Sequence, residues 1–279
     1  MLDRDASEND THPRYAPAMT TTTARAGSRL LDLLDFGYKQ ALSCLFAVSI
    51  VVGLAITHFV DFGLARYDAM LVWCIIVQIV LLATKVETRD ELLVICMFHV
   101  LGLALEVFKV AVGSWSYPDA GVLRIGDVPV YSGFMYAAIA SYICQAWRRF
   151  DLDIDSVPMV PTMITAILFY VNFFTNHWLP DARWPLLIVV AVLMRKTWVR
   201  FRVRQTIYRM PLLVSFLLIG FFIWFVENIA TILGAWSYPG QEAGWTLVHA
   251  SKIGSWMVLV IFSFMLVLWF KQRKKSLVA

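Results

Sequence analysis

Eight long apolar runs constrain this chain more than any other feature of its sequence. A helix needs about 20 mostly apolar residues to cross the hydrocarbon core of a bilayer. Only 16% of the 279 residues are charged, so a water-soluble surface would be short of polar groups. The runs therefore predict an all-α membrane helix bundle with eight transmembrane helices. They cover residues 41–60, 69–86, 91–112, 129–147, 161–179, 184–199, 211–233 and 247–270.

The basic residues flank these runs unevenly. If both termini are cytoplasmic, 19 of the 24 Lys and Arg lie on the cytoplasmic side, four lie outside and Lys109 lies within a run. Such an excess is the usual orientation signal of membrane proteins, so we expect both termini to be cytoplasmic. The basic loop Arg195–Arg209 is expected to bind anionic membrane lipids, and no nucleic-acid partner is expected.

The N-terminal 40 residues form a polar tail without a visible signal peptide, and either Met1 or Met19 could be the natural start. Within the tail, residues 28–39 are amphipathic. They either lie on the membrane surface or form a frayed extension of the first span. All four cysteines lie inside apolar runs without metal-ligand spacing, so no metal site, disulfide framework or cofactor is expected.

A repeat with an offset of 121 residues is the most informative pattern. Glu106 precedes a Trp-Ser-Tyr-Pro motif by nine residues, and Glu227 precedes a second copy by the same distance. Gly113 and Gly234 match at the same offset, as do Gly133 and Gly254. The spacing predicts a parallel 4+4 repeat, with four-helix units at 41–150 and 151–279 and a site at the interface between them.

Glu106 and Glu227 are the leading candidates for chemistry. Nine helical residues rise about 13 Å, which places both carboxyl groups near the bilayer centre. A carboxyl group there must face the bundle interior, pair with a cation or hold a proton. Lys109, Lys252 and His249 complete the candidate catalytic set. An alternative stays open, in which Glu106 and Lys109 form an intrahelical pair that only neutralises both charges.

The candidate substrate-binding residues surround these carboxyl groups. They are Trp115, Tyr117, Trp236, Tyr238, His99 and Asn228. The aromatic residues also fit an interfacial belt, and His99 or Asn228 also fits ordinary helix-to-helix hydrogen bonding. The fixed distance from a glutamate in both halves favours aromatic-walled surroundings for both carboxyl groups, either in one shared site or in two. Aromatic faces stabilise cations and a desolvated acid donates protons, which suits protonation of a polyprenyl double bond and also the binding of a cationic substrate.

Two segments carry motifs that extend beyond this spacing. The first, Glu106–Tyr136, contains Glu-Val-Phe-Lys, Gly-Ser-Trp-Ser-Tyr-Pro and Val-Pro-Val-Tyr-Ser-Gly-Phe-Met-Tyr. The second, Trp224–Trp256, contains Trp-Phe-Val-Glu-Asn, Gly-Ala-Trp-Ser-Tyr-Pro and Lys-Ile-Gly-Ser-Trp. Together they resemble the YoaT-like bacterial membrane proteins over nearly everything after the tail. The resemblance implies a multi-pass protein of the bacterial inner membrane and no particular activity.

A second, weaker resemblance is to membrane carotenoid cyclases and hydratases. Glu106, Gly113, Trp115, Tyr117 and the step Asp127-Val128-Pro129 follow the order of that group's pattern. Asp127 replaces the glycine of the step, and no Val-Pro follows the second Trp-Ser-Tyr-Pro motif. This resemblance implies an isoprenoid or carotenoid-like substrate.

Three functions follow as expectations. The first is a membrane enzyme that acts on a lipid-soluble, isoprenoid-like molecule, with Glu106 or Glu227 as general acid. The second is a proton-coupled transporter in which the paired glutamates relay protons. The third is a non-catalytic membrane component whose buried charges hold helices together. The chain has no motif for nucleotide, serine or zinc hydrolysis.

Overall fold

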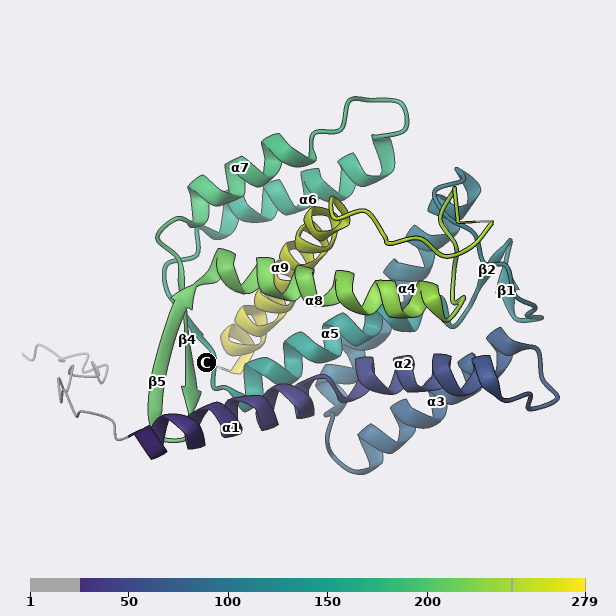
Figure 1. The fold of residues 1–279 in the computed structure, drawn as a ribbon. Helices are drawn as coiled ribbons and strands as arrows, with labels where there is room; N and C mark the ends of the chain where they lie inside the picture. The colour runs from purple at the N-terminus through teal and green to yellow at the C-terminus, as the bar shows by residue number, and fades with distance from the viewer. Residues whose placement is uncertain (1–25, 242, 279) are drawn as a thin grey trace, which may run out of the picture.

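The computed structural model describes residues 26–241 and 243–278, so Met1, Met19 and the tail up to residue 25 lie outside the described residues. The described part is mostly helical (Figure 1). Its helices are α1 (Ala26–Ser43), α2 (Leu45–Phe59), α3 (Arg66–Ala83), α4 (Arg89–Ala111), α5 (Ser132–Arg149), α6 (Met159–Thr175), α7 (Arg183–Met194), α8 (Leu212–Ile232) and α9 (Lys252–Val278). Its strands are β1 (Arg124–Ile125), β2 (Val128–Pro129), β3 (Asp153–Ile154), β4 (Trp198–Val203) and β5 (Thr206–Pro211).

Each predicted span contains a helix, but the helices differ in length and polarity. Within the described residues, α3, α4, α8 and the Lys252–Gln272 part of α9 are long and apolar enough to cross a membrane. Helices α1 and α2 meet at a 63° bend and together qualify as a fifth candidate. Helices α6 and α7 are apolar but shorter. The structure thus supports four or five candidate spans, and the eight-span topology stays a prediction.

Helix α5 lies in the interior of the bundle, where it packs against α1, α2, α4 and α9. Glycines bring α5 close to α4. A Cβ atom on Gly102 would lie 2.3 Å from the ring of Tyr136, and one on Gly133 would lie 2.6 Å from the carbonyl oxygen of His99. Only a residue without a side chain fits these two positions. Many buried side chains of α5 are accordingly small or polar. The sequence of α5 is therefore less apolar than the sequences of the candidate spans.

Two large hydrophobic cores meet at α5, and a small third cluster of Ala146, Phe150 and Val203 lies beside the hairpin. One of the large cores gathers mainly side chains of α2–α5, and the other mainly side chains of α6–α9. Trp147 packs against both cores, and its ring stacks on that of Phe264 with 5.7 Å between centroids. The division lies close to the predicted boundary between 41–150 and 151–279, although the two units themselves stay a prediction.

A three-stranded antiparallel sheet in the order β3-β4-β5 corrects the expectation of an all-α chain. Helix α7 ends at Met194, so the sixth predicted span, 184–199, extended too far. Most of the basic segment predicted as a loop is the β4–β5 hairpin. Several of its charges are also paired with acidic groups. Arg200 pairs with Asp153 and Asp155 at 2.6 Å, and Arg202 pairs with Asp151 at 3.3 Å.

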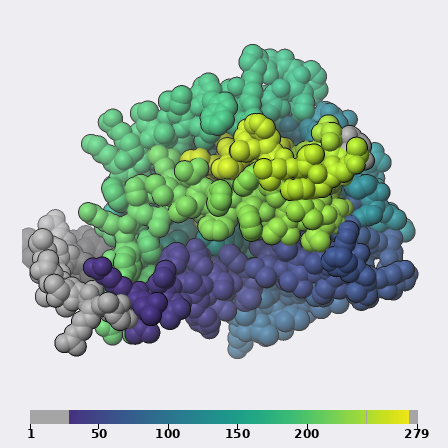
Figure 2. Space-filling model, viewed as in Figure 1, coloured from purple at the N-terminus to yellow at the C-terminus, as the bar shows by residue number. Residues whose placement is uncertain are grey.

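The hairpin docks on the polar face of α1. The carboxylate of Asp32 accepts hydrogen bonds from the Tyr208 hydroxyl at 2.8 Å and from Thr206 at 3.3 Å. Four leucines of α1 are exposed: Leu30, Leu31, Leu33 and Leu34. In Figure 2, α1 and α2 (purple) run along the lower edge of the visible face and α7 (teal-green) along its upper part, with α8 (green) between them. Residues 28–39 therefore belong to the regular helix α1, and both its place on the membrane surface and its continuation of the first span stay predictions.

Candidate functional site

A cavity of about 940 Å³ occupies the bundle between the two cores. Its wall is mostly apolar. Every helix except α3 contributes to it, and α7 contributes only Arg183. At one end it reaches Phe36 and Phe201, next to the hairpin. At the other end it is bordered by Lys109, His177 and Lys252. Both predicted glutamates line its wall, so the cavity joins residues that lie 121 positions apart in the chain.

Glu106 is 3% exposed and accepts hydrogen bonds from three aromatic side chains. The indole N–H of Trp115 and the hydroxyl of Tyr117 both donate to Oε2 at 2.7 Å. The hydroxyl of Tyr136 donates to Oε1 at 2.6 Å. Two of the three donors come from the Trp-Ser-Tyr-Pro motif, as its fixed spacing from the glutamate suggested.

Glu227 is 2% exposed and has a related set of donors. The hydroxyl of Tyr238 donates to Oε1 at 2.5 Å, in the same place in the motif as Tyr117. The indole N–H of Trp256 donates to Oε2 at 2.7 Å. This indole comes from α9, whereas the first half uses the Trp of the motif itself. Trp236, the Trp of the second motif, is buried and lines the cavity.

The backbone at the two motifs is also alike. Helices α4 and α8 both run into a glycine with positive φ, 73° at Gly113 and 70° at Gly234, and only glycine adopts such a conformation at little cost. Beyond these glycines, Ser116 and Ser237 pair as an antiparallel bridge, each N–H donating to the other's carbonyl oxygen at 2.9 Å. The bridge joins the two motifs directly, at equivalent positions.

Lys252 lies between the two motifs. Its ammonium group is 4.2 Å from the ring centroid of Tyr238 and 5.4 Å from that of Trp115. It interacts electrostatically with both Glu227 and Glu106. The structure therefore brings Lys252 together with the predicted carboxyl groups and aromatic residues.

The contacts of Lys109 contradict the alternative in which it forms an intrahelical ion pair with Glu106. Among the described residues, no salt bridge joins the two side chains. The Lys109 ammonium instead contacts Asn176 Oδ1 at 3.3 Å and His177 Nε2 at 2.9 Å, and it lies 4.1 Å from the ring centroid of Phe173. An i,i+3 spacing permits an ion pair, but here the side chain extends toward the end of α6.

Three other candidates stand apart from the carboxyl groups. His249 is exposed and contacts Ser251. His99 packs on the ring of Phe134, with 4.4 Å between centroids, and its Nδ1 has no hydrogen-bond partner. Asn228 accepts from the N–H of Val248 at 2.9 Å, which holds the loop before α9. None of these three lines the cavity.

Tyr136 and Trp256 were not among the predicted site residues, although the sequence contains a signal for both. Tyr136 follows the repeated glycine Gly133 by three residues, and Trp256 follows Gly254 by two. Each aromatic side chain therefore enters from the helix after the motif. An aromatic residue close behind each repeated glycine would have identified both donors.

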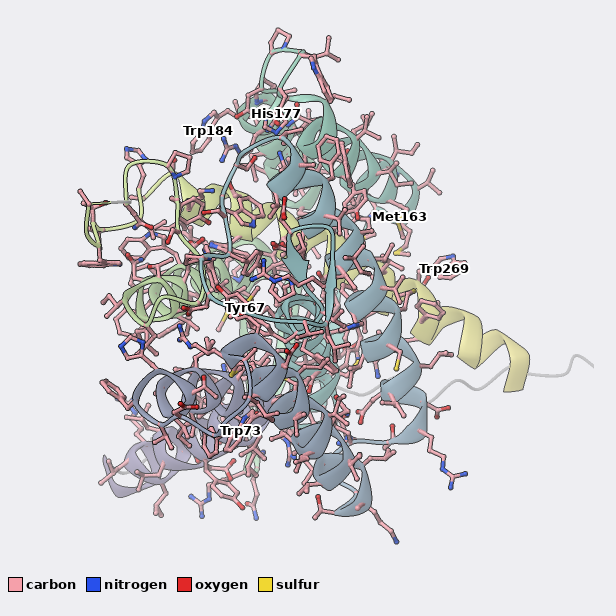
Figure 3. All side chains as sticks on the ribbon, turned by 90° about the vertical axis from the view of Figure 1, so that its right-hand side faces the viewer. Tyr67, Trp73, Met163, His177, Trp184 and Trp269 are labelled. Carbon is pink, nitrogen blue, oxygen red and sulfur yellow. The ribbon has the colours of Figure 1, made fainter. Side chains whose placement is uncertain are left out.

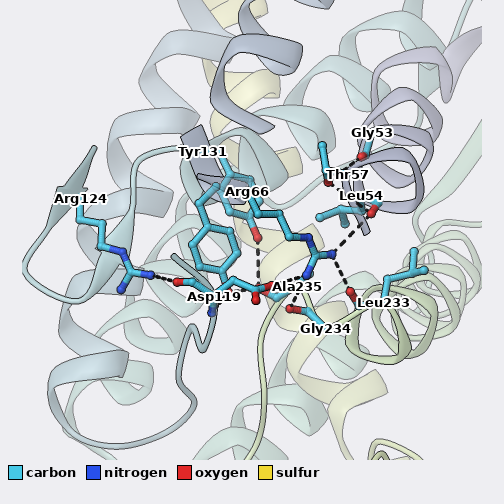
Figure 4. Close-up of polar contacts among 11 residues, drawn as sticks. Gly53, Leu54, Thr57, Arg66, Asp119, Arg124, Tyr131, Leu233, Gly234 and Ala235 are labelled. Carbon is cyan, nitrogen blue, oxygen red and sulfur yellow. Dashed lines mark hydrogen bonds and ion pairs between the residues drawn. The ribbon is translucent and has the colours of Figure 1, made fainter. Parts of the chain in front are cut away.

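Arg66 was not among the predicted site residues either. From the sequence it was counted only as a basic residue on the outer side of the membrane. Figure 4 shows its guanidinium group beside the end of α8. It donates to the carbonyl oxygens of Leu233 at 2.5 Å and Gly234 at 3.2 Å, and it pairs with Asp119. The hydroxyl of Tyr131 donates to the next carbonyl, that of Ala235, at 3.1 Å. These contacts satisfy carbonyl groups that a helix end leaves free.

Tyr117 and Tyr238 keep the hydroxyl protons that they donate to the glutamates, because the pKa of each phenol is raised. Burial, and then the charge of Glu106, raises the pKa of Tyr117 well above its usual value. Burial likewise raises the pKa of Tyr238 well above its usual value. Both hydroxyls keep their protons at neutral pH.

Within the described residues, no three His, Cys, Asp or Glu side chains lie close enough to hold a metal ion.

The described residues form a mostly helical protein with four or five candidate membrane spans and two buried, hydrogen-bonded carboxyl groups on one cavity. The chain belongs to the family described as "Protein of unknown function (DUF817)", whose model matches residues 32–264. It is 50% identical over 247 residues to the "Uncharacterized protein YoaT" of Bacillus subtilis (strain 168), covering 88% of this chain and 94% of that protein. These matches confirm the resemblance to the YoaT-like proteins. No solved structure matches the chain.

Proposed function

We propose that this protein is a membrane-embedded enzyme that protonates a lipid-soluble, isoprenoid-like molecule in its central cavity. The observation that carries the proposal is the position of two buried carboxyl groups on the wall of one mostly apolar cavity of about 940 Å³. Cavities of this size hold elongated small molecules, and an apolar wall with a few polar groups is typical of ligand sites.

Glu227 is the better proton donor of the two. A carboxyl group has about four lone-pair positions for hydrogen bonding. Three aromatic donors occupy Glu106, whereas two direct donors occupy Glu227. Glu227 therefore keeps more room for its own proton and for a substrate, while Glu106 is held as an acceptor.

The proposed step moves one proton. The O–H bond of the Glu227 carboxyl breaks, and the π electrons of a substrate double bond form the new C–H bond. The carboxylate that remains is stabilised by the donors Tyr238 and Trp256. The carbocation lies among aromatic rings that line the cavity, among them Trp115 and Trp236, whose faces attract positive charge.

The parallel 4+4 arrangement belongs to this proposal. The matching helix ends at Gly113 and Gly234 and the bridge between Ser116 and Ser237 support it. We propose further that eight helices cross the bacterial inner membrane with both termini in the cytoplasm. The basic residues at the hairpin end of the molecule support this orientation.

The test is mass spectrometry of lipids extracted from protein purified in mild detergent. Wild type is compared with Glu227→Gln and Glu106→Gln. Glu91→Gln serves as the control, because Gln also fits the third position of the capping box that opens α4. An isoprenoid that accumulates unconverted in Glu227→Gln supports the proposal. The same bulk phospholipids in all four preparations would overturn it.

Proton flux in liposomes then tests the transporter alternative. A flux that Glu227→Gln abolishes, without any converted lipid, favours a proton relay. If both glutamate variants lose only thermal stability, the carboxyl groups hold the helices together and the third function applies.

A further inference from the structure

We propose that the cavity ends in a binding site for an anionic headgroup, so that its ligand is an amphiphile with a carboxylate or phosphate at one end. The site, called the headgroup site below, is formed by Lys109, Asn176, His177, Arg183 and Lys252, all of which line the cavity. Figure 3 shows His177 and Trp184 at this end of the molecule. The inference shares its cavity with the proposed function, but it requires no reaction.

The main evidence for this site is the surroundings of the Lys109 ammonium group. The side chain of Lys109 is buried, and no carboxylate of the described residues lies within salt-bridge distance of its ammonium group. Its contacts are the neutral Asn176 and His177 and the ring face of Phe173. A buried cation without an anionic partner is costly. A bound anion would supply the missing charge.

His177 adds a second donor. An ammonium group only donates hydrogen bonds, so the Nε2 atom of His177, 2.9 Å from Lys109, must accept one. The imidazole is then neutral and carries its proton on Nδ1.

Two further cations stand at the same end. Arg183 and Lys252 are close enough to Lys109 to repel it. Arg183 donates to Ser255 and to the carbonyl oxygen of Ser251, which holds it against the first turn of α9. Lys252 has no carboxylate within salt-bridge distance among the described residues, and its ammonium group faces the rings of Tyr238 and Trp115.

The acidic groups nearby are already engaged. Asp181 pairs with Arg183 at 2.6 Å and accepts from Asn172 at 3.2 Å. Glu106 and Glu227 accept hydrogen bonds from their aromatic donors. The three cations therefore exceed the one carboxylate that pairs directly with any of them.

The remainder of the cavity fits a hydrocarbon tail. Beyond the headgroup site, the wall continues through Phe169, Phe173 and Phe216 toward Phe150 and Phe201 at the hairpin. An amphiphile would place its charge beside Lys109 and its tail among these rings, with Glu227 on the wall between the two ends.

Native mass spectrometry of the detergent-solubilised full chain tests the inference with oleate, oleyl phosphate and oleyl alcohol, which share one hydrocarbon tail. We expect wild type to bind at least one of the two anions about tenfold more tightly than the alcohol. Lys109→Met should remove most of that preference and leave alcohol binding unchanged. Lys85→Met, an exposed lysine outside the cavity, should behave as wild type.

The comparison of oleate with oleyl phosphate identifies the headgroup, because the preferred anion loses more affinity in Lys109→Met. Equal binding of the alcohol and both anions by wild type would overturn the inference, even if Lys109→Met fails to fold. An unchanged preference in a folded Lys109→Met would also overturn it. Glu227→Gln should keep the anion preference, so a failure of the proposed reaction can be distinguished from a failure of this site.

Discussion

Gly102 of α4 lies directly against the ring of Tyr136 of α5, and this contact places the Tyr136 hydroxyl on Glu106. A methyl group on Gly102 would lie 2.3 Å from the ring, and the hydroxyl reaches Oε1 of Glu106 at 2.6 Å. Gly102 stands one helical turn before Glu106, so the space left by the missing side chain serves the carboxyl group next to it.

Gly102→Ala should displace the Tyr136 ring and weaken its hydrogen bond to Glu106. Overpacking of a tight core costs about 1–3 kcal/mol, and the thermal midpoint in detergent measures the loss. Gly37→Ala is the control, because a Cβ atom on Gly37 of α1 meets nothing within 4 Å. That change should be neutral or stabilise by up to about 1 kcal/mol. Equal midpoints for the two variants would contradict the packing described here.

Arg66→Gln should destabilise the protein by about 2 kcal/mol. The change removes hydrogen bonds from a charged donor to the carbonyl oxygens of Leu233 and Gly234, and it leaves those groups and Asp119 without their partner. Thermal unfolding in detergent is the measurement. Arg89→Gln, at an exposed position of the first turn of α4, should change the midpoint little.

Arg200→Gln should cost no more than about 1 kcal/mol, despite its two ion pairs. The Arg200 side chain is 44% exposed and its partners Asp153 and Asp155 are 66% and 38% exposed, so water screens the attraction. Salt should reduce even this small effect. A loss as large as that of Arg66→Gln would show that the hairpin is held by its charges rather than by its contact with α1.

The stability of the protein should depend on pH through Glu87, which lies in the turn between α3 and α4. Burial raises the pKa of Glu87, and hydrogen bonds from Ser141 and Gln78 oppose that shift only in part. The folded state therefore holds this proton more tightly than the unfolded state does. The stabilising contribution is complete below the unfolded pKa of about 4.3 and is lost as the pH rises through the raised folded value.

Glu87→Gln should remove that loss, so the variant should melt above wild type at neutral pH and the difference should shrink toward pH 4. The side-chain oxygen of Gln78 is buried without a partner, and a rotated Gln78 amide can accept from the new amide group. Melting curves of both proteins across this pH range are the measurement. A constant difference between the curves would exclude the titration of Glu87 as its source.

Much of the helical fold could be predicted from apolar runs, because a helix in a bilayer must satisfy its backbone internally and its sequence shows this need. The error at the sixth run has a simple cause. Trp198 and Val199 are apolar and follow α7 after only three residues, so they were counted with it, but they belong to β4. The alternation of Arg and apolar residues from Trp198 to Val203 has the period of a strand. The basic residues of the segment were interpreted as a lipid-binding loop, so this period was not used.

The site could be predicted only in part. Local spacing linked Glu106 to Trp115 and Tyr117, because all three lie within one helix end and its loop. The contact between Lys109 and His177 depends on how α6 packs against α4, and no local pattern reports that. Arg66 shows the same limit, since Leu233 and Gly234, whose carbonyl oxygens it contacts, lie more than 160 positions away in the chain.

The bridge between Ser116 and Ser237 has a consequence for how a ligand reaches the cavity. Two backbone hydrogen bonds fasten the ends of α4 and α8 to each other at one pole of the molecule. Separating the two segments there would break both bonds. For the proposed lipid-soluble ligand, we therefore expect an entrance between helices that lie farther from this bridge.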